Sequence, residues 1–448
     1  MDAQVPRRPV RATAASVVAL AAPLMLAHLT EPLIGLVDTA VIGRLGEVHL
    51  LGAVAIGAVL FDMLFWGLGS LRMSTAGLTA QAHGAGDDRE VARALARAFL
   101  LAAALGCALI ALQRPIMAAT FALMDASPAV TAAARDYVAV RIWSGPFALA
   151  NYAVLGSLIG RGRTDLGLVV QVGLNLTKVA ATLLFVSGLR WGVAGAAFAT
   201  LVAEALGLAG GIWVLRRAGA LPRGVSWTEI MDAAALRRML AVNRDVAIRT
   251  VALLSAFAFF TSQGARAGDV TLAANAVLYN LFLFGSYFLD GFATAAEQLC
   301  GQALGARDEG GFRRVVRLTL NLSVAVGAAV WLGAWFGGAR FIDAVSTSAA
   351  VRDAAKAFLP YAALTPLVGA AAFTFDGVYV GATWTAAMRN LMLAALAIYL
   401  GVYYGAHAMS GAWSNEGLWL AFLVFLAVRG LGQGLLYRRL ARSSFATV

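Results

Sequence analysis

Residues 77–88 read GLTAQAHGAGDD, and a related stretch, QLCGQALGARDE, occupies residues 298–309, which lie 221 positions later. The same offset relates further residues, without a gap, from residue 43 to residue 164 of the first copy. The matching pairs include Gly43/Gly264, Leu51/Leu272, Gln81/Gln302, Arg93/Arg314, Gly156/Gly377 and Thr164/Thr385. We therefore predict that the chain contains two copies of one structural unit.

The composition is that of a chain that crosses a membrane many times. Of the 448 residues, 60% are hydrophobic and only 13% are charged, and the mean hydropathy is +0.77, whereas soluble domains carry roughly 25% charged residues. Twelve apolar blocks are long enough to cross a bilayer as helices. They cover approximately residues 13–43, 51–83, 93–112, 133–160, 166–187, 192–215, 246–264, 271–304, 316–336, 355–381, 389–406 and 417–437. We therefore predict an all-α integral membrane protein with twelve transmembrane helices.

The repeat and the apolar blocks together predict the domain organisation. Six spans is an even number, so both copies enter the membrane in the same orientation. The pseudo-twofold axis that relates the two six-helix bundles should then run along the membrane normal. The expected segments are a tail (1–12), an N-terminal lobe (13–215), an arginine-rich linker (216–245), a C-terminal lobe (246–437) and a second tail (438–448).

The distribution of the 35 basic residues predicts the orientation in the membrane. With the N-terminus inside, most of them fall in cytoplasmic segments, among them Arg216, Arg217 and Arg313, which is the usual bias of membrane proteins. Residues 13–43 are too long for a signal peptide and have no convincing cleavage site. We expect a multi-pass protein of the bacterial inner membrane with both termini in the cytoplasm. The net charge of +11 then reflects topology and contact with anionic lipid, and we expect no nucleic acid as a partner.

Three motifs resemble those of the multidrug and toxic compound extrusion (MATE) transporters. They are P-L…D-T-A-V-I-G in the first span, Q-A-x-G-A-x-D after the second and G-V-A-G-A-A-x-A-T in the sixth. The stretches LDGFATAAEQLCGQALGA (289–306) and FDGVYVGAT (375–383) are similar to the DinF-like branch, and the resemblance extends over roughly residues 15–437. It implies a V-shaped pair of six-helix bundles. It also implies antiport of an organic compound, typically cationic or amphipathic, against inward protons or sodium ions.

The energy source predicted from the residues agrees with this resemblance. The chain has no G-x-x-x-x-G-K-[ST] phosphate loop and no soluble domain that could hold a nucleotide, so an ion gradient would have to drive transport. We expect no nucleotide, no cofactor and no enzymatic activity, and a monomer in the lipid bilayer that binds a small organic substrate.

Other classes of membrane protein fit the sequence less well. A membrane-embedded enzyme would need carboxylates or metal ligands in its outside loops, but the four histidines are scattered and those loops are short. A channel would not need two opposite charges within its spans. Two alternatives within transport stay open: a lipid-linked substrate flippase of the same superfamily, whose relatives usually have more spans, and a sodium-coupled exporter.

Asp38 lies within the apolar stretch EPLIGLVDTAVIG (31–43). A charge at the centre of a bilayer costs at least about 2.5–3.5 kcal/mol. The carboxylate must therefore face water, pair with a cation or be protonated part of the time. A permanent ion pair without a role in turnover is one reading. The resemblance to MATE transporters implies another, in which Asp38 carries the coupling proton and Pro23 and Pro32 allow its helix to bend.

The fifth span departs from the MATE pattern N-x-x-N-x-x-x-D. The chain reads NLTKVAAT (175–182), so Asn175 is kept, while Lys178 and Thr182 replace an asparagine and the aspartate. Together with Gln171, these residues have the spacing i, i+4, i+7 and i+11 and share one face of a helix. Lys178 lies about ten residues from either end of the span, too deep for its ammonium to reach the surface easily. We predict that it pairs with Asp38. Because a fixed positive charge repels Na⁺, we predict that the coupling ion is the proton.

The C-terminal lobe lacks this site, because the offset of 221 places aromatic residues at the equivalent positions. The counterparts of Asp38, Lys178 and Thr182 are Phe259, Tyr399 and Tyr403. Candidates for a cavity that binds cationic substrates are Phe259, Tyr279, Tyr287, Asp290, Glu297, Asp376 and Tyr399. The acidic members could equally lock to Arg389 and the cytoplasmic loops.

Four further charges fall within the predicted spans: Arg72, Arg141, Glu204 and Arg429. Because isolated charges are rare inside membranes, we expect them to pair internally. Arg141, for example, could pair with Glu204 or with Asp62.

Overall fold

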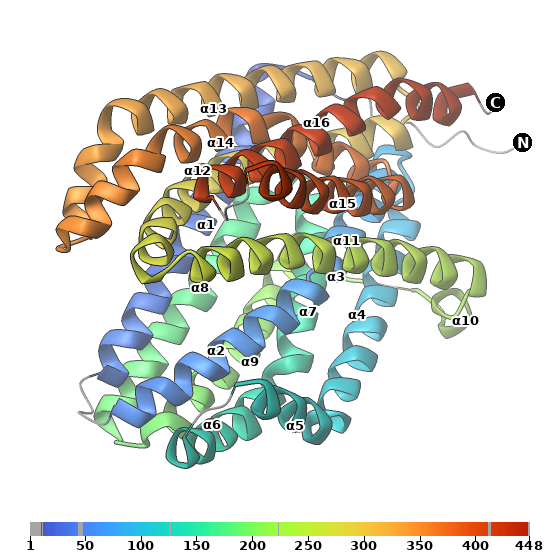
Figure 1. The fold of residues 1–448 in the computed structure, drawn as a ribbon. Coiled ribbons are helices and arrows are strands. Elements are labelled where there is room, and N and C mark those ends of the chain that lie inside the picture. Colours follow the sequence, from blue (N-terminus) through green and yellow to red (C-terminus); the bar gives the residue numbers. More distant parts are fainter. Residues whose placement is uncertain are drawn as a thin grey trace, which may run out of the picture. The chain divides into compact units, whose positions relative to one another are not determined.

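The computed structural model describes residue 10 and residues 12–43, 48–124, 127–222, 224–410 and 414–446, and all regular secondary structure in these residues is helical (Figure 1). Eleven helices in these ranges are long and apolar enough to cross a membrane, and Ala14–Thr30 forms a shorter apolar helix. The described part of the chain therefore confirms the prediction of an all-α protein with many membrane-spanning helices.

The chain forms two compact units. The N-terminal unit comprises residues 26–83 and 87–243, and the C-terminal unit comprises the described residues up to 25, residues 84–86 and the described residues from 244 onward. Helix α1 therefore contributes to both units, because its first part, up to Met25, belongs to the C-terminal unit and the remainder to the N-terminal unit. The domain limits expected from the sequence and the direction of the pseudo-twofold axis stay predictions.

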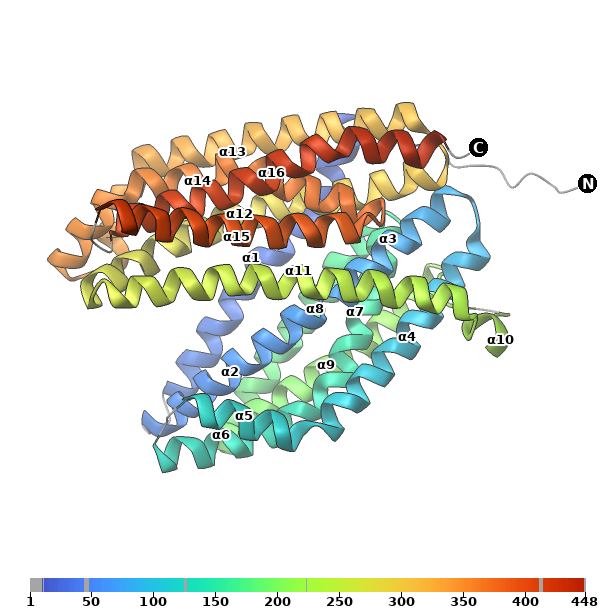
Figure 2. The ribbon, with the colours of Figure 1, turned by 45° about the vertical axis from the view of Figure 1, so that its right-hand side comes forward.

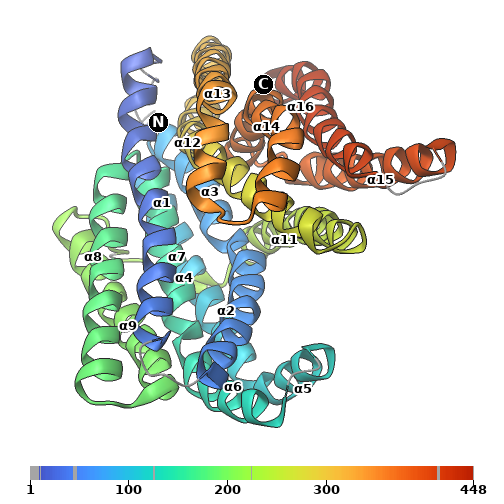
Figure 3. The same ribbon diagram turned by 60° about the vertical axis from the view of Figure 1, so that its left-hand side comes forward.

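The first half of the chain forms α1 to α10. Their bounds are α1 Ala14–Gly43, α2 Val48–Leu68, α3 Ser70–Gly84, α4 Asp88–Ala111, α5 Gln113–Met124, α6 Pro128–Arg141, α7 Gly145–Gly160, α8 Thr164–Thr182, α9 Gly192–Arg217 and α10 Trp227–Ile230. A short 3-10 helix, η1, covers Ile142–Ser144, and a π-helical segment, η2, extends α8 over Leu183–Gly188. Figure 3 shows α8 beside α9, and the two pack together along their length.

The second half forms six helices of 26 to 37 residues (Figure 2). They are α11 Ala233–Arg266, α12 Asp269–Gly305, α13 Glu309–Val345, α14 Ala349–Gly381, α15 Thr385–Ser410 and α16 Asn415–Ala446. In the C-terminal unit, α14 packs against α12, α13 and α16, and α15 packs against α16. The buried core between α11, α12 and α16 is rich in aromatic rings, including Phe282, Trp419 and Phe422.

The internal repeat is visible in the local structure of each unit. Asp87 accepts a hydrogen bond from the backbone N–H of Glu90 (2.8 Å) at the start of α4. Its counterpart 221 residues later, Asp308, accepts one from Gly311 (2.7 Å) at the start of α13. The residue before each cap has a left-handed backbone, with φ of 76° at Gly86 and 58° at the equivalent Arg307. The shared turn keeps its shape even where the second copy has lost the glycine.

Close helix packing also repeats. A methyl group at Gly156 of α7 would lie 2.5 Å from the carbonyl oxygen of Arg72 in α3. A methyl group at the equivalent Gly377 of α14 would lie 1.9 Å from the carbonyl oxygen of Ala293 in α12. The residues contacted are also 221 apart, so both copies bring the same two helix segments together at the same glycine.

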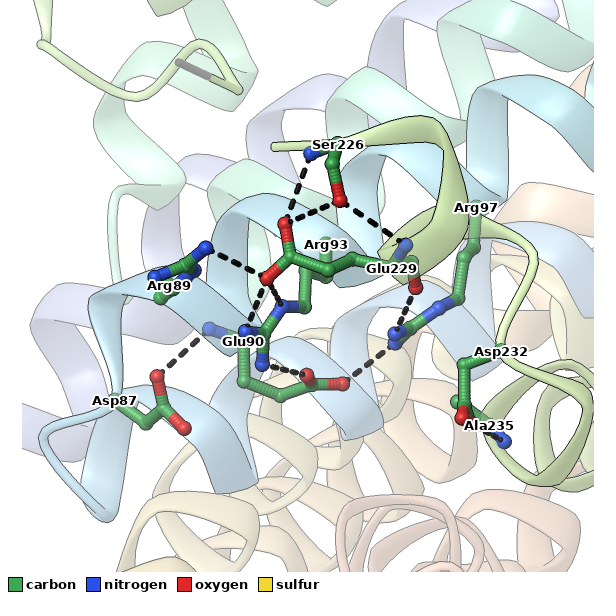
Figure 4. A network of polar contacts seen from close by, with 9 residues as sticks. All are labelled: Asp87, Arg89, Glu90, Arg93, Arg97, Ser226, Glu229, Asp232 and Ala235. Atoms are coloured by element: carbon green, nitrogen blue, oxygen red, sulfur yellow. Dashed lines mark hydrogen bonds and ion pairs between the residues drawn. The ribbon is translucent and has the colours of Figure 1, made fainter. Parts of the chain in front are cut away.

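The predicted linker contains structure of its own. Helix α10 begins with a capping box in which Ser226 and Glu229 bond reciprocally to each other's backbone N–H groups. The Glu229 carboxylate also contacts Arg89 (2.8 Å) and Arg93 of α4, and Figure 4 shows these side chains converging on it. Hydrogen bonds from Ser226 and these two guanidinium groups hold the pKa of Glu229 well below its usual range.

A second layer of ion pairs lies beneath the first in Figure 4. Arg97 donates to Glu90 (2.6 Å) and to the backbone carbonyl of Glu229 (2.9 Å), and Arg93 also contacts Glu90 (3.3 Å). The linker is thereby fixed to the first turns of α4, within the N-terminal unit.

Candidate coupling site in the N-terminal unit

Asp38 of α1 and Lys178 of α8 form an ion pair. Lys178 Nζ lies 2.9 Å from Asp38 Oδ2, and the two side chains are 20% and 23% exposed. The predicted contact between these residues is therefore confirmed. Both side chains are therefore partly buried, and neither is fully enclosed by the protein.

The other predicted residues of α8 line the same side of the helix. Thr182 donates a hydrogen bond from its hydroxyl to Asp38 Oδ1 (3.3 Å), so each carboxylate oxygen has a partner from α8. One turn and two turns before Lys178, Asn175 and Gln171 are joined by a hydrogen bond of 3.2 Å. The face predicted from the spacing thus forms one continuous polar ladder against α1.

One residue of this ladder was missed at the sequence level. The side-chain amide of Asn175 donates to the hydroxyl of Thr30 in α1 (2.7 Å). Thr30 lies eight residues before Asp38 on α1, so the two are on the same side of that helix. The hydroxyl also bonds to the carbonyl of Ala27 (2.7 Å), a common arrangement of threonine in helices that gives no functional signal in the sequence.

The helices that carry the site have irregular features. Helix α1 is unbroken from Ala14 to Gly43 although it contains Pro23 and Pro32; the side chain of Pro32 lies outside the described residues. Directly after Thr182 the chain continues as the π-helical segment η2, and such segments occur often at functional sites. The bending role of the two prolines stays a prediction.

Glu204 of α9 is a second carboxylate of the N-terminal unit. Its Oε2 accepts a hydrogen bond from the side-chain amide of Asn151 in α7 (2.8 Å). Arg141 is hydrogen-bonded to Ser144, and its guanidinium lies over the ring of Phe61, 4.9 Å from the centroid. The positive charge of Arg141 also acts on the Glu204 carboxylate, and a direct ion pair of Arg141 with Glu204 or Asp62 stays a prediction.

In the C-terminal unit, Asp376 of α14 is the centre of a buried polar cluster. Its carboxylate accepts hydrogen bonds from Arg429 (2.7 Å) and Gln433 (2.7 Å) of α16 and from Arg249 of α11. The expected internal partner of Arg429 is thereby identified. Arg249 was missed, although it is a charge within a predicted span and so needed a partner.

One alternative from the sequence was that Asp376 is locked to Arg389, but the structure gives Arg389 another partner. It donates instead to Asp245 (2.6 Å), near the start of the part of α11 that belongs to the C-terminal unit. Asp245 is buried and also contacts Arg244 (3.0 Å). Two separate charge clusters, centred on Asp376 and Asp245, therefore hold α11 to α14, α15 and α16.

The predicted aromatic residues of the C-terminal lobe fall into two groups. Phe259 packs edge-on against Tyr399 and Tyr403, with ring centroids 5.4 and 5.2 Å apart, and Tyr399 is fully buried. Tyr279 packs against Phe257 on the other side of α11, with centroids 5.7 Å apart. Phe422 of α16 joins the two groups into one core cluster, because its ring centroid lies 6.4 Å from that of Tyr399 and 6.1 Å from that of Phe257.

The two acidic candidates of α12 lie next to contacts of that helix with different neighbours, Asp290 near α1 and Glu297 near α14. Asp290 precedes Gly291, where a methyl group would lie 2.5 Å from Met25 and 3.0 Å from the carbonyl oxygen of Ala21. Glu297 is buried two turns further along α12, next to the close contact of that helix with Gly381 of α14. For these residues and for Tyr287, contact with a substrate stays a prediction.

No group of three or more histidine, cysteine, aspartate or glutamate side chains in the described ranges could hold a metal ion. The donors around Asp38 are an ammonium and a hydroxyl.

Proteins of known families match this chain over most of its length. The MatE family model matches residues 23–184 and 246–405, one match in each half of the chain. The DNA damage-inducible protein F of Escherichia coli (strain K12) is 37% identical over 423 residues, which cover 94% of this chain and 91% of that protein. A probable multidrug resistance protein NorM of Deinococcus radiodurans is 31% identical over 441 residues, 92% of each chain.

Solved structures resemble this fold as well. A crystal structure of MATE in the bent conformation has a TM-score of 0.86 and covers 96% of this chain and 97% of its own, at 18% sequence identity. At that identity the likeness concerns the fold alone.

Proposed function

The chain belongs to the MatE family of membrane transporters, and we propose that it exports organic compounds, cationic or amphipathic, in exchange for inward protons. The ion pair between Lys178 and Asp38 carries the proposal. An aspartate paired with a lysine inside an apolar span can exist in two states: ionised and paired with the lysine, or protonated and separated from it. A carrier of the coupling proton needs two such states.

Proton coupling is favoured over sodium coupling by the groups around Asp38. Lys178 Nζ occupies the position 2.9 Å from the carboxylate, where a bound cation would otherwise lie. Thr182 supplies only a hydroxyl on the other oxygen. A sodium ion would have to displace the ammonium and would find few oxygen ligands, whereas a proton needs only the carboxylate itself.

Helix α1 offers a mechanical link between this site and the substrate. The part of α1 that carries Asp38 belongs to the N-terminal unit, and the part up to Met25 packs against Gly291 of α12 in the C-terminal unit. Protonation from outside cancels the attraction to Lys178 and so weakens the attachment of α1 to α8. Bending near Pro23 then changes the packing beside Asp290, the acidic residue we assign to cationic substrates, and bound substrate leaves to the outside.

The name of the Deinococcus radiodurans relative supports an organic substrate. We place the protein in the bacterial inner membrane with both termini in the cytoplasm. In this orientation, export carries the substrate out of the cytoplasm. The protein needs no nucleotide, because the proton gradient supplies the energy. We propose that it acts as a monomer.

The test is efflux of a fluorescent organic cation from proteoliposomes with an imposed pH gradient. Asp38→Asn should abolish pH-driven efflux, because the amide cannot bind and release the proton, while the variant still folds and inserts. Asp343→Asn is the matched control, since Asp343 forms an exposed ion pair with Lys356, and it should transport like the wild type. Full pH-driven efflux by Asp38→Asn would overturn the proposal.

A further inference from the structure

The proposed cycle leaves one charge to be explained. When Asp38 takes up a proton, the ammonium of Lys178 loses its counter-charge inside a membrane span. An unpaired charge is unfavourable there, and charged residues within membrane spans usually pair with one another. A second carboxylate within reach of the lysine would remove this cost and make protonation of Asp38 easier.

The packing of α8 against α9 brings Glu204 to the level of Lys178. These helices follow each other with a short connection, and a methyl group at Gly207 would lie 2.8 Å from Leu174 Cδ1. The two helices run in opposite directions. Moving four residues forward from Leu174 leads to Lys178, and moving the same distance back from Gly207 leads to the residue next to Glu204. Lys178 and Glu204 therefore lie at similar heights along the two helices. Lys178 shares a face with Leu174, and Glu204 shares one with Gly207.

The side chains around Glu204 offer oxygen atoms that could accept hydrogen bonds from a cation. Asn151 holds the carboxylate through its side-chain amide (2.8 Å) and also donates to the backbone carbonyl of Glu204 (3.0 Å). The side-chain oxygen of Asn151 is buried and has no hydrogen-bond partner. An ammonium carries three donors, so at this position it could bond both to the carboxylate and to that oxygen.

The charges around Glu204 come from the neighbouring helices. The helices packed against α9 carry His49 and Asp62 in α2, Arg135, Asp136 and Arg141 in α6, and Asp165 and Lys178 in α8, whereas α7, η1 and η2 carry no charged residue. The positive charges of Arg141 and Lys178 both act on the Glu204 carboxylate. Arg141 is held by Ser144 and by the ring of Phe61, so the lysine is the cation that can move.

We propose that Glu204 is the second docking position of the Lys178 ammonium, occupied when Asp38 is protonated. This inference rests on the proposed function of Asp38. With Asp38 ionised, the ammonium lies on Asp38. When Asp38 takes up one proton from outside, the ammonium moves to Glu204 and the oxygen of Asn151, and it returns when the proton leaves to the inside. The lysine stays paired throughout, and one proton is bound and released per cycle.

The test is the pH dependence of efflux in proteoliposomes. Glu204→Gln should move the midpoint of activation by protons to lower pH by about one unit and reduce the maximal rate, because protonating Asp38 now leaves the lysine unpaired. Glu204→Asp keeps the charge and should restore most of the wild-type profile. If Glu204→Gln does not fold, Asn151→Leu should give a smaller shift in the same direction.

A double variant separates docking of the lysine from a general effect of charge. In a Lys178→Ala background, Glu204→Gln should shift the midpoint by less than half as much as it does with the lysine present. An equal shift in both backgrounds would contradict the proposal, since it would mean that Glu204 acts without the lysine. A wild-type profile for Glu204→Gln, with Asp38→Asn inactive, would overturn this inference alone. An active Asp38→Asn would overturn the proposed function as well.

Discussion

Lys178 Nζ lies 2.9 Å from Asp38 Oδ2, between two apolar helices of the N-terminal unit. The only other lysine of the chain, Lys356, makes an ion pair of similar length (2.7 Å) with Asp343, but with side chains 39% and 44% exposed. The same chemical pair therefore occurs once within the helices we assign to coupling and once in a far more exposed position. This contrast supplies the control for the first prediction.

Removing the ammonium should change how transport depends on pH. In Lys178→Ala the carboxylate loses the charge that favours its ionised form, so activation by protons should move to higher pH. Lys356→Ala should leave the profile unchanged, because exposed pairs contribute only about 0–1 kcal/mol. Efflux rates measured at a series of external pH values check both variants, and equal profiles for Lys178→Ala and the wild type would contradict the assignment.

The glycine contacts that repeat in both units should be sensitive to a single methyl group. Gly377→Ala would place a carbon 1.9 Å from the carbonyl oxygen of Ala293, and we expect it to destabilise the protein by about 1–3 kcal/mol, as overpacking usually does. Gly401→Ala is the control, since nothing lies within 4 Å of its added carbon. Thermal unfolding in detergent should show a lower Tm for the first variant only.

The offset of 221 residues predicted much of this fold, because it relates helix ends as well as residues. α8 and α15 begin at Thr164 and Thr385, the two copies of one position. The pair of Asp38 and Lys178 was also predictable, since two opposite charges in apolar spans need partners and the chain has one lysine at that depth.

The partners of Asp376 could not be predicted in the same way. The sequence suggested Arg389 as one partner, but the packing of α11, α15 and α16 places Arg389 on Asp245 and brings Arg249 and Arg429 to Asp376. Spacing along a helix shows which face a side chain occupies, but not which other helix lies opposite. Arg141 illustrates the same limit, because its ring contact with Phe61 depends on how α2 and α6 meet.

The acidic surface of α12 should contribute to binding of cationic substrates. Asp290→Asn removes the negative charge without changing the shape of the side chain, so affinity for an organic cation should fall and its transport should slow. Asp269→Asn, at the exposed start of the same helix, is the control. Binding measured by fluorescence anisotropy of a cationic dye checks this, and unchanged affinity in Asp290→Asn would exclude the residue from the substrate site.

The attachment of the linker should depend on pH through Glu229. Its pKa is lowered by bonds from Ser226, Arg89 and Arg93, so its stabilising contribution is fully present above the unfolded value of about 4.3. The contribution is lost as the pH falls through the lower, folded pKa. Glu229→Gln should therefore lower the Tm at pH 7, and the difference from the wild type should shrink in acid. Glu309→Gln, which removes an exposed pair with Arg313, should have little effect at either pH.

The central claim is that protons drive the exchange, and imposed gradients in proteoliposomes test it most directly. One set of vesicles carries a pH gradient with equal sodium on both sides, and the other carries a sodium gradient at equal pH, with the membrane potential clamped in both. The account predicts efflux of an organic cation with the pH gradient alone, and its loss in Asp38→Asn. Robust efflux driven by sodium alone, at equal pH on both sides, would contradict it.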